Sequence, residues 1–465
     1  MAFTAGTGRS AAGYGMRAPV FAPGARPAPA PRPVWHMPAA SRTVTWLVAL
    51  SIIIIFAMSP TLLLHMGFNF GSEGGNPLEK FHPSTFLVFG ALGLYAIQYG
   101  NPVSYFDRVA ATHRLLLIYL IGLGILLVQV VIVQRAPFSP VVDTFLPPAL
   151  FLLMLEAVEM RVRERLALFI HGLFLLNALI GYYEFLTGHI LFPPIGGALE
   201  ELTEDWRSAS LLGHPLTNAN MTGAYLLMLV LGGSRGLKPT TAALLCAINF
   251  GAMVAFGGRA ALVMLIMVMS VRGAFTYLGV AAGQRFDLRN AVLFALAIPV
   301  VVMIGMTAYE AGFFDKLASR FVDDNGSATT RLAMFEVFKV LPLQEILFGP
   351  DQELVATRLY TEGLQYGIES FEVAFVITYG LVPSLLFFAT LAIFLVEVLR
   401  RTKAGAIVPM TFFFIVASTS VSLSAKSGLL SLLIIMLLLL MERPAVAAGE
   451  PKSVAVRQRR VFGHA

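Results

Sequence analysis

The sequence has few charged residues and almost no cysteine. Only 13% of its 465 residues are Asp, Glu, Lys or Arg, whereas 57% are hydrophobic. No soluble domain can bury that much apolar surface, so the composition predicts an all-α polytopic membrane protein. Cys246 is the single cysteine, which excludes an intramolecular disulfide and a cysteine-based metal site.

Motifs for nucleotide or metal chemistry are also missing. The chain has no P-loop, no Gly-x-Gly-x-x-Gly, no His-Glu-x-x-His and no spaced pair of aspartates. Asp323 and Asp324 are adjacent rather than spaced, and with Gly326 they predict a turn. Any group that this protein transfers is therefore expected to arrive already activated.

Long apolar runs are what the chain has instead. They predict about 12 transmembrane helices, although several runs are shorter than the roughly 20 residues that a helix needs to cross the hydrocarbon layer. The shortest, 145–160 and 260–271, are the weakest candidates. The predicted spans are 43–66, 83–99, 114–134, 145–160, 166–186, 218–233, 239–256, 260–271, 290–308, 371–399, 406–424 and 427–441.

The distribution of basic residues predicts the orientation of these spans. With both termini in the cytoplasm, 23 of the 33 Lys and Arg residues lie on the inner side, as the positive-inside rule requires. The domain organisation is then a disordered cytoplasmic tail at 1–42, a transmembrane domain at 43–441 and a basic cytoplasmic tail at 442–465. The first of these has five arginines and no acid, and it could instead be a transit sequence.

Two outward loops are long enough to carry a function. They cover about 187–217 and 309–370, and a structureless loop as long as the second is improbable. Its residues 327–341 predict a helix that ends at Pro342, and Phe348-Gly349-Pro350 predicts a turn.

Two arginines in outward segments are candidate phosphate ligands. Arg259 lies in the break Gly257-Gly258-Arg259-Ala260 between two apolar runs, and Arg331 lies in the long loop. A guanidinium presents a planar fork of donors that matches phosphate oxygens. The alternatives are an Arg259 side chain that reaches to the interface and an Arg331 that is simply a surface residue.

A carboxylate at the start of the span 371–399 is the candidate base. Glu369 precedes this span, and a partly desolvated carboxylate there could accept a proton near neutral pH. Glu372, three residues later, shares a helix face with it and is its rival. Either acid could also do no more than stabilise a helix N-terminus.

The segment before the span 218–233 is rich in polar side chains. His214, Asn218 and Asn220 are candidate sugar ligands, together with Arg207 in the same outward loop. The alternative is that Thr217 or Asn218 only caps a helix. Lys426, in the turn between the last two spans, is interpreted as an interfacial anchor.

The order of these motifs resembles the O-antigen ligase and Wzy-type polysaccharide polymerase superfamily over about 205–395. The family's Asn-Pro-Asn segment is similar to Asn218-Ala219-Asn220, and its Ser-Arg-Gly break is similar to Gly258-Arg259-Ala260. Its loop arginine resembles Arg331, with an aromatic, a proline and a Phe-Gly turn after it. Ligases carry histidine where this chain has Glu369, a departure that suits the exopolysaccharide polymerase branch.

The resemblance implies an enzyme of a bacterial inner membrane. A glycan chain on undecaprenyl diphosphate would be transferred to a lipid-linked repeat unit at the periplasmic side. Glu369 would take the acceptor's proton, while Arg259 and Arg331 would stabilise the departing diphosphate, with inversion and without a metal or cofactor. Membrane lipid, a chain-length regulator and an export complex are the implied partners, and nucleic acid is not. The alternatives are a ligase with another acceptor and a transporter or flippase without enzymatic activity.

Overall fold

The fold is described from a computed structural model of the chain, within the unit that begins at Ala39. No residue of 1–38 is described. The described residues are 39–70, 76–193, 206–283, 306, 309–310, 334–339, 341–350, 352–361, 368, 370–420 and 422–443.

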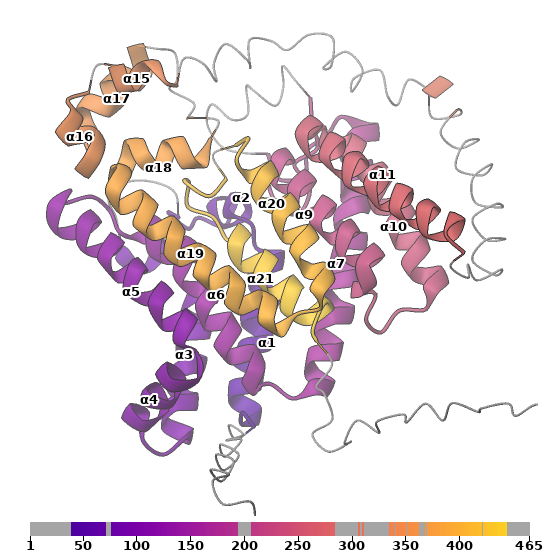
Figure 1. Ribbon diagram of the computed structural model, residues 1–465, viewed down its shortest axis with the longest axis horizontal. Helices are drawn as coiled ribbons and strands as arrows, with labels where there is room; N and C mark the ends of the chain where they lie inside the picture. The colour runs from indigo at the N-terminus through magenta and orange to yellow at the C-terminus, as the bar shows by residue number, and fades with distance from the viewer. Residues whose placement is uncertain are drawn as a thin grey trace, which may run out of the picture. The chain divides into compact units, whose positions relative to one another are not determined.

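The described part of the chain consists of helices, and it contains no β-strand (Figure 1). Prolines at the first position start many of these helices, because a proline has no backbone N–H to leave unsatisfied there. The elements are α1 (Arg42–Ala57), α2 (Pro60–His65), η1 (Pro77–Lys80), α3 (Pro83–Gln98), α4 (Pro102–Thr112), α5 (Arg114–Val128), η2 (Gln129–Val133), α6 (Ser139–Ala157), α7 (Met160–Thr187), α9 (Pro215–Met228), η3 (Leu229–Gly233), α10 (Pro239–Phe256), α11 (Arg259–Ala281), α15 (Glu336–Lys339), α16 (Leu343–Phe348), α17 (Gln352–Thr361), α18 (Phe371–Tyr379), α19 (Leu381–Arg401), η4 (Ala404–Ala406), α20 (Ile407–Ala417) and α21 (Leu429–Leu440).

Six of the described helices are long and apolar enough to cross a membrane, judged by length and composition. Four further apolar helices are shorter. The all-helical, membrane-type fold predicted from the sequence is therefore confirmed in its coarse form. The six are Arg114–Val133, Ser139–Ala157, Met160–Thr187, Pro239–Phe256, Arg259–Ala281 and Leu381–Arg401.

Several predicted span boundaries are wrong. The runs 145–160 and 260–271 looked too short, yet α6 and α11 have 19 and 23 residues because each helix extends into less apolar sequence. The run 43–66 is two helices, since Ser59 caps a new helix that starts at Pro60. The run 371–399 is also two helices, because Gly380 has φ +89° and ends α18. Most of the span 290–308 lies outside the described residues.

Ion pairs gather at one end of the helical body, which we call the basic end. Arg401 at the end of α19 pairs with Glu156 and Glu397, and Glu397 also contacts buried His113. Further ion pairs at this end join α7, the loop before α10 and the residues after α21, among them Arg163–Glu442, Arg235–Glu442 and Arg235–Glu164.

At the opposite end, which we call the site end, hydrogen bonds join the ends of several helices. His82 before α3 contacts the carbonyl of Met58 after α1 at 2.8 Å, and its backbone N–H donates to Asp143 on α6 at 2.9 Å. Before α21, the N–H of Ser427 donates to Thr144 on α6 at 3.1 Å. Helix starts and helix ends therefore alternate between the two ends along the chain.

The loop helices α15 to α18 share a small apolar cluster of their own. Two glutamines at the end of the first membrane-length helix connect this group to the body. The side chain of Gln129 donates to the carbonyl of Phe348, and that of Gln134 donates to the carbonyl of Thr378 at 2.6 Å. At Phe348-Gly349-Pro350, where the sequence predicts a turn, α16 ends and Gly349 has φ +104°. The cluster consists of Met334, Val337, Leu341, Val355, Ile368, Ala374 and Ile377.

Of the predicted loop helix at 327–341, the described residues contain only α15. Residues 327–333 and 340 lie outside the described part of the chain. Pro342 precedes α16, where its fixed φ suits the start of a helix.

Candidate functional site

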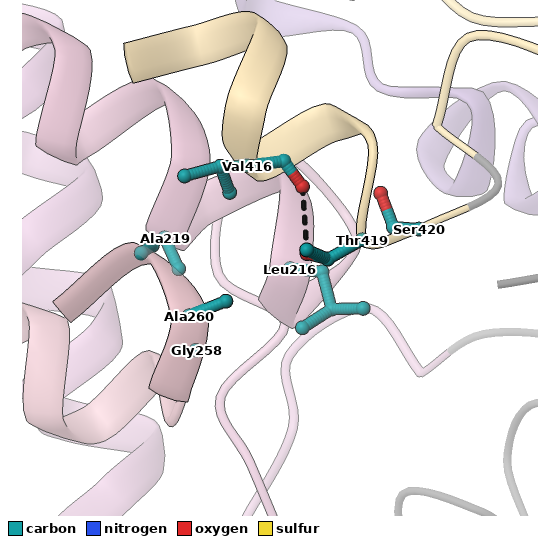
Figure 2. A pocket seen from close by; sticks show the side chains of 8 residues that line it. Leu216, Ala219, Gly258, Ala260, Val416, Thr419 and Ser420 are labelled. Carbon is teal, nitrogen blue, oxygen red and sulfur yellow. Dashed lines mark hydrogen bonds between the residues drawn. The ribbon is translucent and has the colours of Figure 1, made fainter. Parts of the chain in front are cut away.

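A small cavity at the site end is lined by three segments that lie far apart in the sequence. Its volume is about 20 Å³, enough to hold about one water molecule. Figure 2 shows side chains from α9, α11 and the end of α20 around this space. The lining residues are Leu216, Ala219, Gly258, Ala260, Ala261, Val416, Thr419 and Ser420.

The first wall of the cavity is the start of α9. His214 caps this helix, with its ring Nδ1 accepting from the N–H of Leu216 at 3.3 Å. Because the helix begins at Pro215, the interpretation of Thr217 or Asn218 as its cap is wrong. The backbone amide that His214 satisfies is one of the four that a helix N-terminus leaves without partners.

The segment that leads into α9 is held tightly by α7. Glu184 is fully buried, and its carboxylate accepts from Ser208 Oγ at 2.6 Å and from the N–H groups of Ser210 and Leu191 at 2.9 and 3.0 Å. Two turns earlier on α7, the side-chain oxygen of Asn177 accepts from the N–H of Leu211 at 3.1 Å. These bonds fix the turn in which Ser210 has φ +42°.

The two asparagines predicted to bind sugar are buried within the helix packing. Asn218 is completely inaccessible and donates to the carbonyls of Ala209 and, at 3.0 Å, His214. Asn220 donates to the carbonyl of Phe413 on α20 at 3.2 Å. The side-chain oxygen of each has no hydrogen-bond partner in the described structure. Asn218 thus fixes the segment that leads into α9, and Asn220 joins α9 to α20.

The second wall is the break between α10 and α11. Gly257 ends α10 in the left-handed conformation, at φ +64°, which a residue with a side chain adopts only at a cost. A Cβ on Gly258 would overlap the Cβ of Ala219, so this glycine lets α11 approach α9 closely. Arg259 follows as the first residue of α11, half-buried and between two residues that line the cavity.

The third wall is the hydroxyl-rich stretch that ends α20. Thr419 donates to the carbonyl of Val416 at 2.7 Å, as Figure 2 shows, and Ser420 donates to the carbonyl of Ala417 at 3.2 Å. These hydroxyls satisfy carbonyls that the end of a helix leaves without partners. The hydroxyl oxygens keep lone pairs that can accept a further hydrogen bond.

Lys426 fixes the far end of the same loop. Its ammonium donates to the carbonyls of Phe70 and Lys80 and lies 3.7 Å from the centre of the Phe70 ring. Burial lowers the pKa of Lys426 to about 8. Lys426 is thus an anchor for the loop between α20 and α21, held by protein groups.

Glu372 connects the loop helices to this third wall. Its carboxylate accepts hydrogen bonds from Ser418, at the end of α20, and from Ser370 at 3.0 Å. Ser370 also caps α18 by accepting from the N–H of Val373 at 3.4 Å. The start of α18 and the end of α20 are therefore joined through a single carboxylate.

The electrostatics around His214 keep its ring neutral. Burial and, to a lesser degree, the charge of Arg207 lower the pKa of His214 to about 4. A neutral ring agrees with its role as a hydrogen-bond acceptor at the start of α9. Arg207 acts on this ring from the segment that leads into the helix.

Of the eight predicted site residues, six are described. The structure brings the neighbourhoods of His214, Asn218, Asn220, Arg259 and Glu372 to one end of the helical body. Arg207 belongs to the same group through its effect on the pKa of His214. Glu369 and Arg331 lie outside the described residues.

Sequence reasoning missed the hydroxyl-rich third wall and the buried acid Glu184. A run of six Ser and Thr residues within 418–427, between two apolar helices, is the signal for the first. A lone acid inside the apolar stretch of α7 is the signal for the second, because ionisable groups in such helices are rarely without a role.

No protein-family model matches the chain, and neither a curated protein nor a solved structure is significantly similar to it. Among the described residues, no cluster of three or more His, Cys, Asp or Glu side chains could hold a metal ion.

Proposed function

We propose that this protein is a membrane polysaccharide polymerase, which transfers a growing glycan from a polyprenyl diphosphate to a lipid-linked repeat unit. The observation that carries the proposal is the meeting of three walls around one cavity: the start of α9, the Arg259 break and the hydroxyl-rich end of α20. The first two are segments in which the sequence motifs of a polymerase were expected, and the third is added by the structure. They supply a cation, hydroxyls and a nearby carboxylate at one end of an apolar body.

The position of Arg259 supports a role in anion binding. A helix N-terminus carries a partial positive charge, so an arginine there gains nothing from the helix dipole. The α9 and α11 N-termini both lie at the cavity, where the two dipoles and the guanidinium favour a negatively charged ligand. A diphosphate leaving group has this chemistry.

The reaction that we propose is a direct displacement. The acceptor hydroxyl attacks the anomeric carbon of the donor, the bond from that carbon to the diphosphate oxygen breaks, and Glu369 receives the hydroxyl proton. Arg259 and Arg331 stabilise the charge that develops on the diphosphate, which leaves with the lipid. One displacement inverts the anomeric centre. The reaction takes place at the periplasmic face of the inner membrane, and the basic end lies in the cytoplasm.

The placement of buried acids favours an enzyme over a transporter. A transporter is expected to hold charges near the middle of its spans. In the described helices, the buried carboxylates of Asp143, Glu184 and Glu397 all lie within about one turn of a helix end. Each of them has hydrogen-bond donors from the protein, so they hold the structure together at its two surfaces.

A ligase would use the same displacement with a different acceptor. The product separates the two activities: a polymerase lengthens the lipid-linked glycan, whereas a ligase moves it to another molecule. Deleting the gene from the bacterium that carries it should cause short lipid-linked repeat units to accumulate.

Complementation of this deletion tests the proposal. Wild-type protein should restore long polymer, whereas Arg259→Ala, Arg331→Ala and Glu369→Gln should leave the accumulated repeat units unpolymerised at equal protein levels in the membrane. Normal polymer in the deletion strain, or in all three variants, contradicts the proposal. Loss of uptake or export with unchanged polymer length would favour the transporter instead.

A further inference from the structure

The carboxylate of Glu372 lies between two hydroxyl groups from different elements. Ser370 belongs to the N-terminal cap of α18, and Ser418 follows the last residue of α20. Each hydroxyl donates to a different oxygen of the carboxylate. Figure 1 shows α18 beside the loop that follows α20.

Helix stabilisation alone does not explain this arrangement. An acid in the first turn of a helix is favoured by the helix dipole even when it is exposed to water. The Glu372 side chain instead reaches a residue 46 positions later, and it is half-buried. Hydrogen bonds to an ionised group are roughly twice as strong as neutral ones. A contact of this kind is suited to holding two elements at a fixed distance.

The element that Glu372 holds is a wall of the cavity. Ser418 is followed directly by Thr419 and Ser420, whose side chains line the cavity. On the other side, Ser370 is preceded in the sequence by Glu369, the base of the proposed reaction. The contact thus joins the start of α18 to the wall that Thr419 and Ser420 form.

We propose that Glu372 is a positioning residue, which clamps the start of α18, the helix that follows Glu369 in the sequence, to the end of α20 at the cavity wall. This inference rests on the proposed function and assigns Glu369 and Glu372 different tasks. With both of its oxygens engaged by serine hydroxyls, the Glu372 carboxylate acts through Ser370 and Ser418. The proton transfer belongs to Glu369.

A double-mutant cycle tests the clamp. Purified Glu372→Gln, Ser418→Ala and the double variant are assayed for glycan lengthening, with the lipid-linked repeat unit that accumulates in the deletion strain as the substrate. Each single change removes a charge-assisted hydrogen bond, so kcat should fall by about 10- to 100-fold. The kcat of the double variant should be no lower than that of the less active single variant, because all three variants lose the same contact. Thr276→Ala, which removes an exposed hydroxyl near the end of α11, is the control and should stay within about twofold of wild type.

The pH profile separates a clamp from a base. Loss of the clamp lowers kcat but keeps the acidic limb of the profile, because Glu369 still titrates. The inference is overturned if the Glu372→Gln variant loses this acidic limb, or if its kcat is about 1,000-fold lower than that of Ser418→Ala. Either result would make Glu372 the base. Additive effects in the double variant also overturn the inference.

A second cycle does not depend on the enzymatic activity. The losses of stability that the three variants show in thermal unfolding should also be non-additive, since the clamp joins two elements in the folded state. If Arg259→Ala and Glu369→Gln leave lengthening intact, the proposed function fails, and the unfolding cycle still decides whether the contact exists. Additive unfolding effects overturn the clamp by themselves.

Discussion

Gly258 is the residue whose size sets the distance between two walls of the cavity. A Cβ at this position would overlap Ala219 on α9, whereas a Cβ on Gly273, further along α11, meets nothing within 4 Å. We expect Gly258→Ala to lower the unfolding temperature and to reduce glycan lengthening, with a stability loss of about 1–3 kcal/mol from overpacking.

Gly273→Ala is the matched control for this change. It removes a flexible residue from the same helix without a steric conflict, so it should leave activity intact and raise stability by up to about 1 kcal/mol. Equal behaviour of the two variants in thermal unfolding and in the lengthening assay would contradict the close approach of α9 and α11.

Arg259 is expected to act through the shape of its guanidinium as well as its charge. Arg259→Ala should lower the rate by about 10²–10³, the loss typical of one preorganised donor. Arg259→Lys should restore less than about a tenth of the lost activity, because an ammonium has no bidentate fork. Arg272→Lys on the same helix is the control and should be neutral. Full rescue by lysine would show that only the charge matters.

His214 should make the stability of the site end depend on pH. The pKa of this ring is about 4 in the folded protein, below the ordinary value of 6.5, so the unfolded chain binds more protons between these values. The stabilisation from neutral His214 is therefore complete above about pH 6.5 and is lost as the pH falls toward 4, by at most about 3 kcal/mol.

His214→Asn removes the titrating ring and keeps a side chain that can cap a helix. The measurement is the unfolding temperature of each protein as a function of pH. Subtracting the curve of the variant from that of the wild type removes the contributions of the histidines that both proteins share. An identical dependence in both proteins would mean that His214 is not held neutral.

At the residue scale, the sequence predicted the segments of the candidate site more accurately than the role of each side chain. The glycine break at Arg259 and the polar segment before α9 could be found because they interrupt apolar runs. The burial of Asn218 and Asn220 could not, since it depends on where α20 and the loop before α9 come to lie. A hydroxyl such as Ser418 gives no signal by itself until a carboxylate from another element lies beside it.

At the scale of elements, the loop before α9 depends on α7. Glu184→Ala would leave the N–H groups of Ser210 and Leu191 and the hydroxyl of Ser208 without their buried acceptor. We expect faster hydrogen exchange in residues 206–214, because the opening of this loop then costs less free energy.

The control for this change is Glu159→Ala, an exposed acid just before the same helix. It should leave the exchange rates of 206–214 unchanged. If both variants exchange as the wild type does, the carboxylate of Glu184 does not hold the loop.

Helix ends were harder to predict than helix existence. Ser59-Pro60 and Gly380 split two apolar runs that read as continuous, because hydropathy records how apolar a stretch is and not where its backbone turns. Conversely, α6 begins before its most apolar residues, since packing of Val141 and Thr144 stabilises turns that composition alone would not support.

At the scale of the whole molecule, the grouping of loops into two ends is the basis for the predicted orientation. The loops rich in Arg and Lys meet at the basic end, and the walls of the cavity meet at the other. We expect the basic end to face the cytoplasm because positive loops are retained there.

Single cysteines report this orientation directly once Cys246 has been replaced by serine. His189→Cys at the site end should react with a membrane-impermeant maleimide in intact cells, and Lys238→Cys at the basic end should react only after the cells are opened. Both side chains are exposed, so access to the reagent depends on the membrane. The reverse pattern would place the cavity in the cytoplasm and contradict the periplasmic reaction.

The most direct test of the whole account is lengthening of a lipid-diphosphate-linked oligosaccharide by the purified protein, with chelator present to remove divalent metals. The account predicts a ladder of longer lipid-linked products, free polyprenyl diphosphate in equal amount to the bonds formed, and loss of both with Arg259→Ala. A folded protein that forms neither product, with or without added magnesium, would contradict it.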